Sequence, residues 1–158
     1  MFTRRAVAAG LLASLAMGMF QMLYEAVAGA GLWSPPTLIA ATLLRDLQAA
    51  AIPVAFQPLA VVLGLMGHMM NSMILALLFA LLIAPRISSR GGLVIGGALF
   101  GLGVFVVMRF AVVPFLDTVL LSLNMPAFAM AHLMWGGIIG LVPGWQTRRA
   151  TVLQQAHA

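Results

Sequence analysis

Two histidines in similar surroundings are the residues of this sequence best suited to bind a ligand. His68 and His132 each follow a small residue, and each is followed by methionine two positions later and by isoleucine six positions later. Two imidazoles on neighbouring helices could ligate a haem iron from both sides, hold a metal ion, or handle a proton or solute. Alternatively, each imidazole hydrogen-bonds to a neighbouring polar group, such as Asn71 or Glu25, in a packed interface. The sequence favours this last interpretation and leaves the others open.

Methionines gather near both histidines and raise the possibility of a copper site. Those concerned are Met66, Met69, Met70, Met73, Met130 and Met134. Thioether sulfur and imidazole together suit Cu(I). Methionine is also an adaptable apolar filler, and these residues occupy all faces of a helix rather than one. We therefore expect core filling; haem b or copper held by His68 and His132 is possible but not favoured, and the cofactor stays unknown.

Glu25 and Arg109 are each the only formal charge in the interior of a long apolar block. A charged side chain in hydrocarbon costs at least about 2.5–3.5 kcal/mol on insertion scales, so these two are expected to form an ion pair. At about 1.5 Å per residue, Glu25 lies about 28 Å along its block and Arg109 about 25 Å along its own. Both histidines fall in the same half of the bundle, so we predict one polar cluster of Glu25, His68, Asn71, Arg109 and His132.

The sequence gives little support to catalysis, to thiolate metal sites or to nucleic-acid binding. The chain has no cysteine, and its only acidic residues are Glu25, Asp46 and Asp117. It therefore lacks thiolate sites, paired catalytic carboxylates and a recognisable nucleophile–base set. All eight basic residues are arginines, and most flank apolar blocks rather than forming a basic face, which argues against nucleic-acid binding. We expect a protein that is not an enzyme.

The elements that would position the cluster are long apolar helices. Hydrophobic residues make up 63% of the 158 residues and charged residues 7%, whereas a soluble domain has about 25% charged residues. About 20 residues of helix cross a hydrocarbon core of about 30 Å. The sequence predicts an all-α integral membrane four-helix bundle, a single domain over 1–158, with spans at about 6–32, 56–84, 93–113 and 126–145. Segments 35–49 and 115–124 are too short to span and should be interfacial, and 146–158 form a polar tail.

The first span is longer than the apolar region of a signal peptide, so we expect it to be retained.

The arginines predict the orientation of these spans. Six of them flank the spans on one side, namely Arg4, Arg5, Arg86, Arg90, Arg148 and Arg149. Arg45, beside Asp46, lies in a connection on the other side. Because cytoplasmic loops carry an excess of basic residues, both termini are expected in the cytoplasm.

The two halves of the chain share one plan, which predicts two tandem helical-hairpin repeats. Each half has a basic start, a span rich in small residues, a proline, a short segment, and a span that bears a histidine. Small and polar residues also recur at helical spacing, a pattern that lets helices pack closely in lipid. The stripes are Gly10, Ser14, Gly18, Gln21 and Glu25; Gly64, His68, Ser72 and Ala76; Gly97, Gly101 and Arg109; and His132, Gly136 and Gly140.

Three segments carry a resemblance to known proteins: Trp33 to Ala40, Gly67 to Ser72, and Ala131 to Leu133. They resemble small uncharacterised bacterial four-span inner-membrane proteins, some of which are labelled sodium:proline symporter. The resemblance implies a location in the bacterial inner membrane and no established activity or site.

The expected function is that of a non-enzymatic membrane module. Such a module would bind or pass a small solute, ion or proton through the polar cluster, or serve as an accessory subunit of a larger membrane complex. The alternative is a redox subunit that holds haem b or a metal between His68 and His132. Lipid is the expected surrounding, and a homo-oligomer or a larger complex is the expected assembly.

Overall fold

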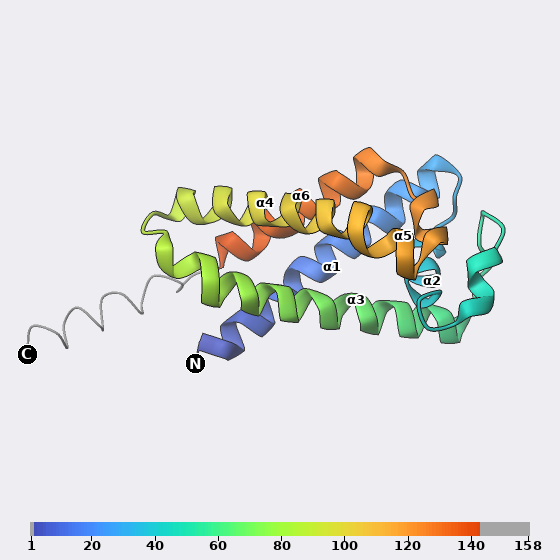
Figure 1. Ribbon diagram of the computed structural model, residues 1–158, viewed down its shortest axis with the longest axis horizontal. Coiled ribbons are helices and arrows are strands. Elements are labelled where there is room, and N and C mark those ends of the chain that lie inside the picture. Colours follow the sequence, from blue (N-terminus) through green and yellow to red (C-terminus); the bar gives the residue numbers. More distant parts are fainter. Residues whose placement is uncertain (1, 143–158) are drawn as a thin grey trace, which may run out of the picture.

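The computed structural model describes residues 2–142, which form helices joined by short connections, with no strand in this range. Four long helices run alternately up and down the bundle: α1 (Phe2–Ala28), α3 (Pro58–Leu78), α4 (Arg90–Val107) and α6 (Met125–Leu141) (Figure 1). The prediction of an all-α fold is confirmed. The apolar helical stretches Thr3–Ala28, Pro58–Arg86 and Arg90–Leu116 are long enough to cross a membrane, and the apolar Met125–Leu141 is shorter.

Local sequence explains where these helices begin and end. Ser89 and Asn124 cap α4 and α6, each accepting a backbone N–H bond at 3.0 Å. α1 ends at Ala28 rather than at the predicted residue 32, because Gly29 adopts a φ of +92° that favours glycine. α6 ends at Leu141 in the described range, and the predicted residues up to 145 and the polar tail 146–158 lie outside that range.

Two of the long helices widen just before a proline. α3 continues into the π-helix η2 (Phe79–Ile83) and the 3-10 turn η3 (Ala84–Arg86), which contains Pro85. α4 continues into the π-helix η4 (Met108–Val112) and then α5 (Val113–Leu116), which contains Pro114. Proline lacks an amide hydrogen and crowds the carbonyl group four residues before it, which favours a wider turn at that point. Arg109 thus lies in a π-helix, an element frequent at functional sites.

The short elements gather at one end of the bundle (Figure 1). They are α2 (Ser34–Ala40), the 3-10 helix η1 (Arg45–Ala49), α5, and the 3-10 helix η5 (Thr118–Ser122). The predicted segment 35–49 is therefore two helices joined by a turn. The start of α1 and the η3–α4 connection lie at the opposite end, so Arg4, Arg5, Arg86 and Arg90 share that end and Arg45 lies at the other.

The helices pack in the order α3, α1, α6, α4. α1 packs against both α3 and α6, α4 packs against α6, and α2 covers the beginning of α3. α6 is therefore the central partner of both α1 and α4. This order decides which side chains can meet inside the bundle.

The predicted glycine stripes form the α4–α6 interface. A β-carbon added at Gly101 would lie 2.1 Å from the carbonyl oxygen of His132, and one at Gly136 would lie 2.1 Å from that of Gly97. Both of these carbonyl oxygens belong to the backbone, which cannot rotate away as a flexible side chain can. Only residues without a side chain allow the two backbones to come this close.

Gly101→Ala is expected to destabilise the protein, whereas Gly103→Ala two residues away is not. The added methyl group at position 101 must force the helices apart, and overpacking of this kind typically costs about 1–3 kcal/mol. A β-carbon at Gly103 meets nothing within 4 Å, so alanine there should leave the thermal midpoint unchanged or raise it. The measurement is the thermal unfolding of both purified variants in detergent. Equal midpoints for the two would contradict the close α4–α6 packing.

Candidate functional site

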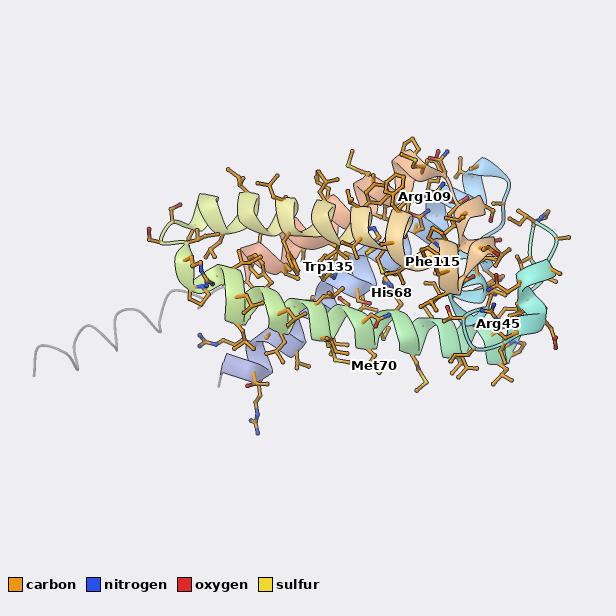
Figure 2. All side chains as sticks on the ribbon, viewed as in Figure 1. Arg45, His68, Met70, Arg109, Phe115 and Trp135 are labelled. Carbon is orange, nitrogen blue, oxygen red and sulfur yellow. The ribbon has the colours of Figure 1, made fainter. Side chains whose placement is uncertain are left out.

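Polar side chains from α1, α3 and α6 form three levels along the inside of the bundle. We call these residues the polar column: Ser14, Gln21, Glu25, His68, Ser72, Asn124, His132 and Trp135, together with the backbone of Gly10. Figure 2 shows that His68 lies between Trp135, toward the N-terminal end, and Arg109, toward α5. The first level lies nearest the end of the bundle that carries the N-terminus, and the third lies nearest the start of α6.

The first level joins three helices through one hydroxyl group. The Trp135 indole Nε1 donates to Ser72 Oγ at 2.6 Å, and Ser72 Oγ in turn donates to the Gly10 carbonyl oxygen at 2.6 Å. Trp135 is 2% exposed, and its ring packs 6.0 Å from that of Phe100. All hydrogen-bonding capacity of the indole is used, so this level has a structural role. The sequence stripe contained Ser72, but nothing in the pattern pointed to Trp135 as its partner.

The second level holds the two histidines. His68 Nε2 lies 3.1 Å from the Ser14 carbonyl oxygen, and His132 Nδ1 lies 2.9 Å from the Phe128 carbonyl oxygen. A carbonyl group only accepts, so each of these ring nitrogens carries a proton and the other nitrogen of each ring is left as a possible acceptor. His68 lies one helical turn before Ser72, and His132 lies three residues before Trp135, the two residues joined at the first level. The two imidazoles therefore lie at the same level of the bundle.

The packing around each imidazole differs. His68 lies over Gly18, where an added β-carbon would be 3.7 Å from His68 Nε2. His132 is 6% exposed and is enclosed by aromatic rings, edge-on to Phe128 at 4.5 Å and to Phe105 at 5.9 Å. The His132 ring is thus held from two sides, and the His68 ring lies beside Gly18 with enough room for a β-carbon at that position.

The third level is built around Glu25, which is 2% exposed. Its Oε1 accepts from Gln21 Nε2 at 2.9 Å and from the backbone N–H of Asn124 at 3.2 Å. Asn124 is the N-cap of α6, so the carboxylate lies at the positive end of that helix dipole. The start of α6 supplies the stabilisation that the sequence analysis assigned to Arg109.

The predicted ion pair between Glu25 and Arg109 is wrong for the described structure. Their charged groups form no ion pair, because α6 lies between the helices that carry them. Arg109 is half-buried, its guanidinium carbon is 6.0 Å from the centre of the Phe110 ring, and its buried Nε has no hydrogen-bond partner among residues 2–142. Two further buried atoms near the column, Ser14 Oγ and Gln21 Oε1, also lack a partner within that range.

Asn71 does not join the cluster. His68 and Ser72 face α1, whereas Asn71 is exposed on the outer side of α3. The expectation that methionines fill the core is also wrong for Met66, Met70 and Met130, which are 62%, 54% and 54% exposed. These three side chains lie on the outside of the bundle rather than in its core.

A separate polar network, which the sequence analysis missed, closes the end of the bundle near α2 and α5. Asp117 is 2% exposed and accepts from Thr42 Oγ1 and Gln48 Nε2, both at 2.8 Å. Gln48 Oε1 accepts from Thr118 Oγ1 at 3.1 Å and from the backbone N–H of Val119 at 3.3 Å. These bonds tie the connection after α2 to the one after α5. An aspartate in an otherwise apolar segment was the available signal, but its partners lie about 70 residues away in the sequence.

The arrangement can hold a polar or charged group but offers few metal ligands. In the described part of the chain, no group of three or more His, Cys, Asp or Glu side chains is placed to bind a metal ion. His68 and His132 offer two nitrogens, and Arg109 offers a cation without a counter-ion among residues 2–142. Comparisons with protein-family models, with curated proteins and with solved structures find no match to this chain.

Proposed function

We propose that this protein is a non-enzymatic membrane module that binds or passes a small anionic solute or ion through the polar column and the adjoining Arg109, alone or as an accessory subunit. The observation that carries the proposal is Arg109, whose buried Nε has no partner among the described residues. A cation in an apolar helix needs a counter-charge, and Glu25 is engaged with Gln21 and the start of α6. An anion from solution would supply the missing partner.

The position of Arg109 beside the histidine level favours a small polar ligand. Arg109 follows Phe105 by one helical turn, and Phe105 contacts the His132 ring. An anion held by the guanidinium group would therefore lie beyond the histidine level, toward α5. The uncommitted nitrogens of the two imidazoles could then pass a proton together with the anion.

The module is proposed to lie in the bacterial inner membrane, with four spans and both termini in the cytoplasm. Three apolar helical stretches of 26, 29 and 27 residues support insertion. Four arginines at the end that carries the N-terminus, against Arg45 at the other, support the orientation.

Two parallel hairpin repeats are part of this proposal. Each half of the described chain consists of a long helix, a short α-helix, a 3-10 helix and a second long helix. The Asp117 network joins the corresponding short segments of the two halves. A histidine-bearing helix closes each half, which would explain why the two imidazoles lie at one level of the bundle.

The test of anion binding is a thermal shift. The purified protein is unfolded in detergent while sodium chloride, acetate or phosphate replaces sodium gluconate at constant ionic strength. A bound ligand at one hundred times its Kd stabilises the folded state by about 2.7 kcal/mol, so at least one anion is expected to raise the midpoint. The rise should be lost in Arg109→Gln and kept in Arg90→Gln, which changes an exposed arginine at the start of α4. No shift with any of the three anions, or equal shifts in both variants, would contradict the proposal.

A redox subunit is the second candidate, because the two imidazoles lie at one level of the bundle and each retains one uncommitted nitrogen. Haem b bound between them would give the purified protein a Soret band that both His68→Ala and His132→Ala remove. A colourless protein free of bound metal would rule out this alternative.

A further inference from the structure

We infer that two copies of this chain associate through the outer face of α3, with Asn71 at the centre of the contact. Asn71 is exposed, and its amide makes no hydrogen bond to any of residues 2–142. Among the other asparagine, glutamine, serine and threonine residues in the long helices of that range, Ser14, Gln21 and Ser72 are buried, and Thr3 is exposed in the first turn of α1. Asn71 is therefore the one such side chain that the single bundle leaves uncovered away from a helix end.

The position of Asn71 along the helix makes this exposure costly. It lies 13 residues after Pro58 and 15 residues before Arg86, the two ends of the 29-residue apolar helical stretch. The inference rests on the membrane location in the proposed function, which puts Asn71 near the middle of the bilayer. An amide there finds no water, so it is stabilised by a hydrogen bond to another helix.

The neighbours of Asn71 form a surface that a second helix can fit. Gly67, Asn71, Ile74 and Leu78 follow one another at intervals of four, three and four residues, the spacing of a left-handed helix pair. Ile74 is 51% exposed and Leu78 is 41% exposed. A β-carbon at Gly67 would meet only Ile39 Cγ2, at 4.0 Å, so packing inside one copy does not require glycine there. Figure 2 shows the adjacent Met70 pointing away from the other helices.

A second copy is the partner that matches this surface. The asparagine amide both donates and accepts, so it is complementary to itself across a two-fold axis. Two copies inserted with the same orientation bring their α3 helices together in parallel. Their Asn71 side chains then lie at the same depth and can bond to each other.

Cysteine crosslinking tests this contact cleanly, because the natural chain has no cysteine. Ile74→Cys is expected to form a disulfide-linked dimer when membranes that contain the full chain are oxidised. Leu99→Cys, at a 64% exposed position on α4, serves as the control and is expected to stay monomeric. Adding Asn71→Leu to Ile74→Cys should lower the crosslinked fraction at least threefold, and light scattering should show two copies per particle for the natural chain and one for Asn71→Leu.

Three results would overturn the inference: no crosslinking through Ile74→Cys, equal crosslinking through Leu99→Cys, or crosslinking that Asn71→Leu does not reduce. The crosslinking result can be distinguished from the result of the anion-binding test. Asn71→Leu should keep the thermal shift with anions, and Arg109→Gln should keep the crosslink, because the two variants change opposite sides of the bundle.

Discussion

Replacing Asp117 with alanine is expected to lower the free energy of unfolding by about 2–3 kcal/mol, because two partly buried hydrogen bonds to a buried carboxylate are lost. Thr42 Oγ1 and Gln48 Nε2 both donate to the carboxylate, and their bonds hold the connection after α2 against the connection after α5. For a chain of this size, the thermal midpoint in detergent should fall by roughly 5–10 °C.

Asp46→Ala provides the matched control for this prediction. Asp46 lies in η1, two residues before Gln48, but it is exposed. Its replacement removes the same charge from the same end of the bundle and should leave the midpoint nearly unchanged. Similar losses for Asp46→Ala and Asp117→Ala would mean that charge at this end of the bundle, rather than the buried network, determines stability.

The sequence was sufficient to predict the helices and the faces through which several of them pack. Long apolar blocks and proline and glycine boundaries indicate each helix, and glycine spacing indicates where α4 meets α6. The end of α1 was placed too late, because a glycine in the left-handed region cannot be told from a glycine within a small-residue stripe. The turn within 35–49 depends on bonds to Asp117, which is distant in the sequence.

The candidate site was predicted only in part, because helical periodicity gives the depth of a residue but not the order of helices around the bundle. His68 and His132 lie at one level of the bundle, since α3 and α6 are joined one turn further on by Ser72 and Trp135. Glu25 and Arg109 lie in the same half of the bundle, yet α6 separates their helices. Asn71 follows His68 by three residues, but α3 packs mainly against α1 and α2 and meets α6 through Ser72, so the Asn71 side chain, on another face of α3, is left exposed.

The proposed site and the proposed dimer both depend on a bundle that crosses the bilayer, with Asp46 and the η3–α4 connection on opposite sides. The structure puts these two segments at opposite ends of the helices. Because no natural cysteine interferes, single cysteines at Asp46 and Ser88, both exposed, can report the side on which each segment lies.

The decisive measurement is labelling of Asp46→Cys and Ser88→Cys by a maleimide that cannot cross membranes, applied to intact bacterial cells and to permeabilised ones. Asp46→Cys is expected to be labelled in intact cells, and Ser88→Cys only after permeabilisation, because the arginines flanking Ser88 retain that connection in the cytoplasm. The difference should be close to all-or-none. Labelling of Ser88→Cys but not Asp46→Cys in intact cells, or recovery of both variants outside the membrane fraction, would contradict the proposed arrangement.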